Sequence, residues 1–386
     1  MRILHLSADY PDPLIPAKTR AVANLLELAS AGESGHTHRV VSLNRVGWRA
    51  GMHAIDFADQ TGGPHRALAY GAPGKGLFLR RSIERVADWV VQDCAAAGFT
   101  PDLVHAHKIS VEGIAGVRLA EHWGVPLVVS VQGNTDLKII GARRDLRPLY
   151  SRIWRDAEIA FPFAPWARAG LDTLLGARTG TIIALPCPTP ADAIIAPALA
   201  QSPVICTAFN FRDAANKNAA RLIRATARAA TDVPGIRLEI IGGGDAAAFA
   251  ALSALADDVA PGRVRFLGSL PNTEMQRRFN AATAFALVSH RESYGMVFAE
   301  ALLAGAPCLI PRGRAIDGYF ADGSAVLSAD PKDEAEITRC LVRLVREEHG
   351  FKARLAELGA SGGLDLMTRA AIRDRYLGAL ATIGKY

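Results

Sequence analysis

The chain has 386 residues, of which half are hydrophobic and 21% are charged. This globular balance excludes a disordered or collagen-like chain, and the length predicts roughly two or three domains. The formal net charge is +6, from 44 Lys and Arg against 38 Asp and Glu. Such a mild excess fits an anionic partner, without choosing between a nucleotide, a phospholipid surface and a nucleic acid.

Cysteine spacing and hydropathy narrow the expected location. The five cysteines are odd in number and no two follow a C-x-x-C pattern, so we expect neither a disulfide framework nor a zinc site and predict a reducing, cytoplasmic location. The first residues lack the apolar stretch of a signal peptide, and no run approaches about 18 apolar residues. Peripheral attachment to a membrane stays open.

Short apolar runs alternate with amphipathic stretches through the first half of the chain. Expected strands are 3–6, 39–43, 103–106 and 126–131, and expected helices are 19–31, 80–97 and 111–123. This alternation is typical of a parallel sheet with helices on both faces.

Three prolines in residues 186–190 interrupt this pattern, since proline continues neither a helix nor a central strand. The alternation then restarts. Expected strands are 204–208, 237–241, 264–268, 284–288 and 308–311, and expected helices are 215–230, 245–255, 273–281, 296–304, 333–348 and 366–381.

The pattern as a whole predicts an α/β fold of two doubly wound, Rossmann-like domains that face each other across a cleft. Residues 1–190 form the first domain and 191–365 the second, while 366–386 form a final helix that packs back toward the first domain. Ligands of such sheets bind at the carboxyl ends of the strands.

Residues 290–307 follow a predicted strand and open a predicted helix. Small residues leave the first backbone amides accessible to an anion, and the helix dipole adds to the attraction. Glu292 precedes this helix. Glu300 lies about two turns into it, among apolar residues where an unpaired carboxylate is costly. We expect Glu300 to accept hydroxyl donors such as those of a ribose, whereas a solvated helix face is the alternative.

Two further loops carry candidate residues. Arg212 and Lys217 are two cations on the loop after strand 204–208, which suits a pyrophosphate, although solvated charges at a helix start explain them equally well. His105 and His107 lie two apart at the end of strand 103–106. That spacing also suits a metal, but no third ligand is evident, so we predict no metal site.

The Glu-x7-Glu pattern of Glu292 and Glu300, followed by Ala-Leu-Leu-Ala-Gly-Ala-Pro, resembles the retaining glycosyltransferases of family 4, which have the GT-B fold. The resemblance covers most of the chain. It implies that Glu292 contacts the donor sugar and that Glu300 holds the ribose of the donor. The diphosphate would bind the amides of the loop that contains Ser293, Tyr294, Gly295 and Met296.

The resemblance also covers the preceding loops. Family members carry an Arg and a Lys five apart, here Arg212 and Lys217, which grip the diphosphate; the family's Gly before that Arg is Phe211 here. Gly243 stands in a turn that looks like the Gly-x-Gly turn beside the nucleotide. The run from Gly242 does not complete G-x-G-x-x-G, because Ala247 takes the last position.

The chain departs from the family in its first domain. The family's His-x-His is present, so His107 is a candidate for contact with the substrates, and a hydrogen-bonded structural role for each histidine is the alternative. Gln132 stands where the family has the His beside the reacting sugar. Glutamine exchanges no proton at neutral pH, although it forms hydrogen bonds, and Asp136 is a candidate substitute contact. The family's first glycine turn is also missing, so Lys18 and Arg20 are expected to supply charge to the donor phosphates, with ordinary surface residues at a helix start as the alternative.

The predicted function is therefore a retaining hexosyl transfer from a nucleoside-diphosphate sugar, UDP or GDP, to an acceptor hydroxyl. The expected acceptor is a saccharide or lipid-linked saccharide in envelope or exopolysaccharide synthesis. No cofactor is expected, because Arg212 and Lys217 would neutralise the diphosphate. A non-hydrolysing sugar-nucleotide epimerase and a non-catalytic sugar-nucleotide binding protein are the alternatives, and a dehydrogenase ranks last.

A basic run and nearby aromatic residues bear on a membrane partner. The run comprises Arg143, Arg144, Arg147, Arg152 and Arg155, and the aromatics are Trp154, Phe161, Phe163 and Trp166. This set suits peripheral contact with an anionic membrane at the inner face of the cell membrane, or a solvated face over core aromatics. No nucleic-acid binding module accompanies the charge, so no nucleic-acid partner is expected.

Overall fold

The computed structural model describes residues 1–32 and 35–383, with all their side chains except that of Lys75. These residues form two compact units. Unit 1 comprises Met1–Phe163, Ala167–Pro188 and the chain from Arg369 on, and unit 2 comprises Ala164–Trp166 and Thr189–Thr368. The predicted final helix thus belongs to unit 1; residues 384–386 of that prediction lie outside the described residues.

Unit 1 has an eight-stranded sheet in the order β3-β4-β2-β1-β5-β6-β7-β8, in which only β3 and β4 pair antiparallel. The strands are β1 (Arg2–Ser7), β2 (Thr37–Val46), β3 (His53–Phe57), β4 (His65–Gly71), β5 (Leu103–Ala106), β6 (Leu127–Val131), β7 (Ile159–Pro162) and β8 (Thr181–Ile182). The helices are α1 (Ala21–Ser30), α2 (Leu79–Ala96), α3 (Glu112–Trp123), α4 (Asn134–Ala142), α5 (Arg147–Asp156), α6 (Pro165–Leu175) and α13 (Arg369–Leu380).

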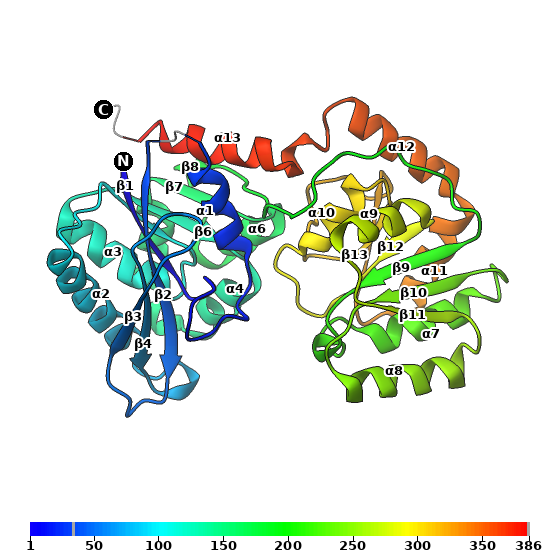
Figure 1. The fold of residues 1–386 in the computed structure, drawn as a ribbon, viewed down its shortest axis with the longest axis horizontal. Coiled ribbons are helices and arrows are strands. Elements are labelled where there is room, and N and C mark those ends of the chain that lie inside the picture. The colour runs from blue at the N-terminus through cyan, green and yellow to red at the C-terminus, as the bar shows by residue number, and fades with distance from the viewer. Residues whose placement is uncertain (33–34, 384–386) are drawn as a thin grey trace. The chain divides into compact units, whose positions relative to one another are not determined.

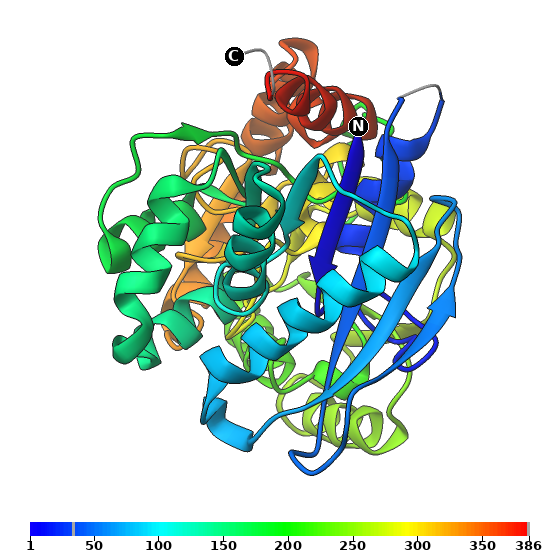
Figure 2. The same ribbon diagram turned by 90° about the vertical axis from the view of Figure 1, so that its left-hand side faces the viewer.

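Helices cover both faces of this sheet. On one face α1 and α13 lie beside each other (Figure 1), and they bury an apolar cluster that includes Ile3, Leu103 and Tyr376. The other face carries α2 and α3, which lie toward the viewer in Figure 2. Gly116 lets α3 approach closely, since a Cβ there would come within 2.9 Å of Leu127. The C-terminal helix is therefore part of the core of unit 1.

Unit 2 has a wholly parallel sheet in the order β11-β10-β9-β12-β13-β14. Its strands are β9 (Val204–Ala208), β10 (Arg237–Ile241), β11 (Val264–Gly268), β12 (Ala284–Ala286), β13 (Cys308–Pro311) and β14 (Val326–Ala329). Its helices are α7 (Ala219–Ala229), α8 (Ala246–Val259), α9 (Asn272–Ala281), α10 (Met296–Leu303), α11 (Glu334–Arg346) and α12 (Glu348–Ala360). This strand order is that of a Rossmann fold.

The prediction of two α/β domains with parallel sheets is confirmed, but several elements differ from expectation. The stretch 53–71 contains two unpredicted strands, because β4 mixes His65 and Arg66 with small alanines and lacks a long apolar run. The predicted helix 215–230 begins only at Ala219, because a 3₁₀ turn at Phe211–Asp213 and a left-handed Asn218 precede it. Lys217 therefore lies on a loop.

Tyr376 tests the contribution of α13 to unit 1. Its side chain is fully buried beside Phe161, so Tyr376→Ala should lower the free energy of unfolding by about 3–5 kcal/mol. Exposed Asp374 on the same helix is the control, and its alanine variant should stay within about 0.5 kcal/mol of wild type. Urea denaturation of both variants checks this, and equal midpoints would contradict a core role for α13.

Candidate functional site

The strand order reverses at the centre of each sheet. In unit 1 the reversal falls between β1 and β5, and in unit 2 between β9 and β12. Loops that leave the carboxyl ends of two such strands diverge, so the strand ends stay uncovered by helices and ligands bind there. Almost all of the candidate residues lie on these loops or on those of the adjacent strands.

The loop after β9 presents two cations. Asn210 caps the 3₁₀ turn by accepting the Arg212 backbone amide at 2.9 Å, and the Arg212 side chain is exposed. Within the described part of the chain, the Arg212 guanidinium has neither an ion-pair nor a hydrogen-bond partner. Lys217 lies farther along the same loop and is about one-fifth exposed.

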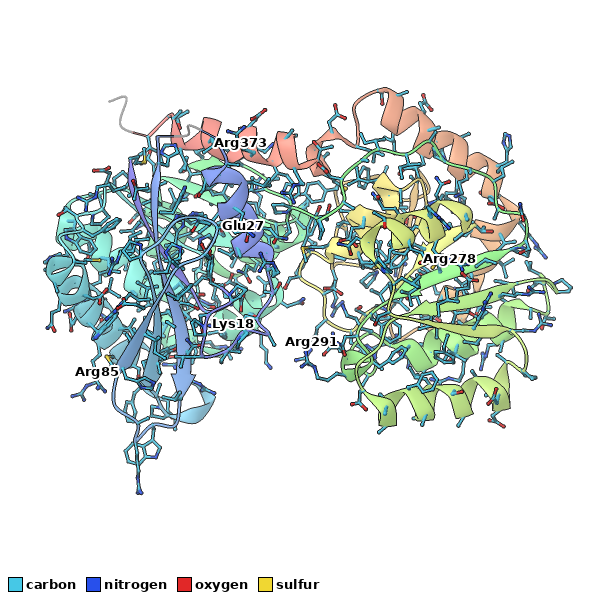
Figure 3. The ribbon with its side chains drawn as sticks, in the orientation of Figure 1. Lys18, Glu27, Arg85, Arg278, Arg291 and Arg373 are labelled. Carbon is cyan, nitrogen blue, oxygen red and sulfur yellow. The ribbon has the colours of Figure 1, made fainter. Side chains whose placement is uncertain are left out.

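Lys217 meets the loop after β12 through an ion pair. Its Nζ lies 2.6 Å from Glu292 Oε2, which also accepts a 3.3 Å hydrogen bond from Ser289 Oγ. The backbones join as well, because the His290 amide donates to the Asn216 carbonyl at 2.8 Å and the Asn216 side chain donates to the Arg291 carbonyl. The structure thus brings together two segments that lie 75 residues apart. Figure 3 labels Arg291 on this loop.

The glycine turn after β10 packs against the first loop. The Phe211 amide donates to the Gly243 carbonyl at 2.9 Å. Gly242 has φ +152°, and a Cβ there would lie 1.9 Å from the Phe209 carbonyl oxygen. No side chain fits at this position, so the glycine is required for the approach of the two loops.

Helix α10 begins beside the Lys217–Glu292 pair with no side chain capping its N-terminus. Gly295 takes the cap position with φ +71°, and a Cβ there would lie 3.0 Å from Glu292 Cγ. Ser293 and Met296, on either side of the cap, are partly exposed, whereas Tyr294 is buried. The first amides of a helix carry partial positive charge and attract anions.

Glu300 lies in the second turn of α10 and lines a recess with Asn272, Met275 and Gln276. Burial raises the pKa of this carboxyl to about 7. Among the described residues it has no ion-pair or hydrogen-bond partner, and Gln276 Nε2 is also buried without one. An unpaired carboxylate and an unpaired amide thus line the same recess and are available to a ligand with hydroxyl groups.

In unit 1, His107 follows β5 and is completely buried. Its Nε2 lies 3.1 Å from Nδ1 of His5, a residue on β1 that the sequence did not single out. His5 Nε2 in turn lies 2.9 Å from His38 Nδ1, and His105 contacts Ser130 and Tyr376. Burial lowers the pKa of His107 to about 3, so this imidazole is neutral.

Gln132 and Asp136 lie at the β6–α4 turn, but only one of them is available to a substrate. The Gln132 side chain is buried, and its Nε2 has no partner among the residues described. Asp136 instead accepts the Ser110 amide at 2.9 Å and the Gln132 amide at 3.4 Å. The expectation that Asp136 replaces the missing imidazole finds no support, because its carboxylate holds the loop backbone together.

Lys18 lies in the loop between β1 and α1 (Figure 3) and is held inside unit 1. Its Nζ lies 2.8 Å from Asp12 Oδ2 and donates to Ser42 Oγ at 2.8 Å. The side chain is only 9% exposed. A carboxylate therefore already neutralises the charge that was expected to reach the donor phosphates.

A second buried charge cluster was not predicted. Lys108 Nζ lies 2.5 Å from Asp9 and 3.9 Å from Glu112, whose Oε1 accepts the Ala8 amide. Burial raises the pKa of Glu112, against the opposing effect of the Lys108 ammonium. Only the i,i+4 spacing of Lys108 and Glu112 signals this pair in the sequence, and Asp9 lies about 100 residues away.

The basic run does not coincide with an aromatic surface. Arg143, Arg152 and Arg155 each pair with a carboxylate. Trp154 and Phe161 are fully buried, which favours the solvated-face alternative. None of the helices in the described residues is long and apolar enough to cross a membrane.

Comparison with known proteins links both units to one group of enzymes. Residues 202–347 match the family described as Glycosyl transferases group 1, and residues 19–188 match the Glycosyl transferase 4-like domain. The chain is 26% identical over 407 residues to the glycogen synthase of Mycobacterium tuberculosis, across 98% of this chain and 95% of that protein. It is also 26% identical over 330 residues to the D-inositol 3-phosphate glycosyltransferase of Streptosporangium roseum, across 73% and 70% of the two chains.

Solved structures show the same fold. Sucrose-phosphate synthase from Thermosynechococcus elongatus matches with a TM-score of 0.72 at 17% identity, over 99% of this chain and 98% of that one. HepE of Anabaena, in complex with UDP and glucose, matches with a TM-score of 0.64 at 15% identity, over 99% and 100%.

The raised pKa of Glu300 predicts a pH dependence of stability. Its folded pKa of about 7 exceeds the ordinary value of 4.5, so the neutral carboxyl stabilises the fold and this contribution is lost as pH rises through 7. Between pH 5 and pH 8, ligand-free wild type should lose on the order of 2 kcal/mol relative to Glu300→Gln. Urea denaturation at both pH values measures the difference, and parallel pH profiles would contradict it.

Proposed function

Because the chain belongs to the glycosyl transferases of group 1 and is a GT-B glycosyltransferase, we propose that unit 2 binds a nucleoside-diphosphate sugar as the donor. The observation that carries this proposal is the Lys217–Glu292 pair at 2.6 Å beside the uncapped N-terminus of α10. A cation, a carboxylate and helix-start amides at one place suit the junction between a sugar and its diphosphate.

We assign three groups with positive charge or positive partial charge to the binding of the diphosphate. Arg212 is exposed and unpaired within the described residues, so it binds phosphate oxygens without losing a protein partner. Lys217 and the amides of residues 293–296 complete the set. These groups stabilise the charge that develops on the leaving diphosphate, and the reaction then needs no metal at the diphosphate.

The two glutamates take different parts of the donor. Glu292 is fixed by Lys217 and Ser289, so its remaining lone pairs accept hydrogen bonds from sugar hydroxyls. Glu300 has an unpaired carboxylate in its recess, which suits the two hydroxyls of a ribose. Binding of those donors to the ionised form lowers the pKa of Glu300 again.

We assign the acceptor to unit 1, at the carboxyl ends of β5 and β6, where His107 and Gln132 lie buried. Neither side chain suits a general base, because the His107 pKa is about 3 and glutamine does not titrate. A retaining transfer in which the leaving phosphate accepts the acceptor's proton requires no protein base. Gln132 Nε2, buried and unpartnered among the described residues, then donates to a substrate oxygen.

The relatives support a hexose donor and a sugar-like acceptor. Anabaena HepE is described in complex with UDP-glucose, and other matches are named for glycogen, sucrose-phosphate and inositol 3-phosphate products or substrates. We therefore propose a UDP- or GDP-hexose as donor and a saccharide or lipid-linked saccharide as acceptor. Envelope or exopolysaccharide synthesis and attachment to an anionic membrane remain predictions.

Product analysis tests the reaction class. Thermal-shift screening against UDP-, GDP-, ADP- and TDP-sugars should identify one donor by a raised melting temperature. Incubation of the protein with that donor and saccharide acceptors should yield free nucleoside diphosphate and a glycoside. NMR should show that the glycoside keeps the anomeric configuration of the donor. An epimerised nucleotide sugar formed without acceptor would instead identify an epimerase, and binding without any turnover would identify a non-catalytic protein.

The Glu300→Ala variant tests the donor site itself. Loss of the ribose hydrogen bonds to a charged group should weaken donor binding by about 10- to 100-fold, since each such bond contributes about 1.5–3 kcal/mol. Calorimetric titration with the donor measures this affinity. Glu357→Ala, which removes an exposed carboxylate on α12 of the same unit, should leave it unchanged. Equal affinities of the two variants would contradict the Glu300 assignment.

A further inference from the structure

Three buried imidazoles converge at the centre of the unit 1 sheet. His5 lies on β1 directly beside His105 on β5 in the parallel register, and His107 follows two residues later, so all three side chains lie on one face. Each is completely buried. The three rings lie between β1 and β5, where the strand order reverses. His5 is about 100 positions away in the sequence from His105 and His107.

The ring nitrogens are spaced for coordination. One nitrogen from each histidine lies within 4.8 Å of the other two, and the His5–His107 separation is 3.1 Å. Two imidazole nitrogens on one tetrahedral zinc ion lie about 3.3 Å apart, given Zn–N bonds of about 2.0–2.1 Å. The closest pair therefore has nearly the separation of metal ligands. The His105 nitrogen lies within 4.8 Å of that pair, and coordination through it replaces one of the two hydrogen bonds of that ring.

The hydrogen bonds among these rings are incomplete without a further partner. Neutral imidazole has one N–H and one acceptor nitrogen, so the chain His107–His5–His38 is satisfied internally in either of two proton arrangements. Each arrangement leaves an N–H at one end, and both end nitrogens, His107 Nδ1 and His38 Nε2, are buried without a partner among the described residues. Such groups are costly inside a protein. A metal held by His107 Nε2 replaces the His5–His107 hydrogen bond and leaves His107 Nδ1 as an N–H, so the orphaned end nitrogens do not themselves argue for the ion.

The histidine rings have hydrogen-bond partners of the kind that orient metal-binding histidines. His105 contacts Ser130 Oγ at 2.9 Å through one nitrogen and Tyr376 Oη at 3.0 Å through the other. If one nitrogen binds a metal, the opposite N–H still donates to a hydroxyl and fixes the ring. His5 similarly keeps a donor to His38. The set contains imidazoles alone, which suits zinc and neighbouring transition ions and not magnesium or calcium.

We propose that His5, His105 and His107 bind one divalent transition-metal ion of the zinc class at a buried site in unit 1. The ion cross-links β1 to β5 and, through His105 and Tyr376, supports α13. It takes no part in the chemistry of the diphosphate, which is assigned to unit 2. Binding energy at such a site adds directly to the stability of unit 1.

Metal content tests the site on the whole, untagged chain. Protein stripped with chelator, incubated with excess zinc and passed through gel filtration should retain about one zinc per chain by mass spectrometry, and its melting temperature should rise. Retention below about 0.2 zinc per chain would overturn the proposal. Activity need not be measured, so this outcome is independent of the proposed transferase function.

Matched variants locate the ligands. His5→Asn and His107→Asn should each lose zinc retention, whereas His65→Asn, which removes another fully buried imidazole of the same sheet, should keep it. Zinc retained by both ligand variants would exclude the site. If a variant fails to fold, X-ray absorption on the zinc-loaded wild type decides: a shell of about three imidazole nitrogens near 2.0 Å supports the site, and any other shell overturns it.

Discussion

The reversal of strand order at the centre of each sheet is the constraint on which the functional features depend. Where two neighbouring parallel strands send their chains to opposite sides, no helix covers their carboxyl ends, and backbone and side-chain polar groups there lack helix partners. In unit 2 this happens at β9 and β12. Arg212, Lys217 and Glu292 lie on the two loops that diverge from that point.

The two units differ in how their charged side chains at the strand ends are paired. In unit 1, the buried ammonium of Lys18 pairs with Asp12 and that of Lys108 pairs with Asp9. Unit 2 leaves Arg212 without a partner among the described residues and places Glu300 where burial raises its pKa to about 7. An unpaired buried carboxyl costs stability, and proteins keep such groups chiefly where a ligand compensates for them. Unpaired positive charge is therefore available to a ligand at Arg212, whereas Lys217 shares its charge with Glu292.

The sequence predicted what local pattern determines. Apolar runs located most strands of both sheets, and the alternation of apolar and amphipathic stretches located the helix that begins at Met296. Contacts between residues far apart in the sequence could not be predicted in this way. Nothing near Lys217 indicates that its partner is Glu292, and nothing near Lys18 indicates that Asp12 and Ser42 occupy its ammonium. The missed strands β3 and β4 lack a long apolar run: β3 is exposed or half-buried along its whole length, and β4 is mostly buried although it begins with His65 and Arg66.

The histidine cluster depends on the pairing register of β1 with β5, which the spacing of residues in the sequence does not reveal. His105 and His107 alone give two ligands, too few for a metal, and their spacing fits any buried strand end. Pairing of β1 with β5 adds His5 at the level of His105, and β2 adds His38 within hydrogen-bonding distance. Four neutral rings on one face then share too few partners for their nitrogens. A cation bound by one lone pair from each of His5, His105 and His107 would replace the His5–His107 hydrogen bond and hold the three rings together. His107 Nδ1 and His38 Nε2 would then both carry protons, so the cation does not supply their missing partners.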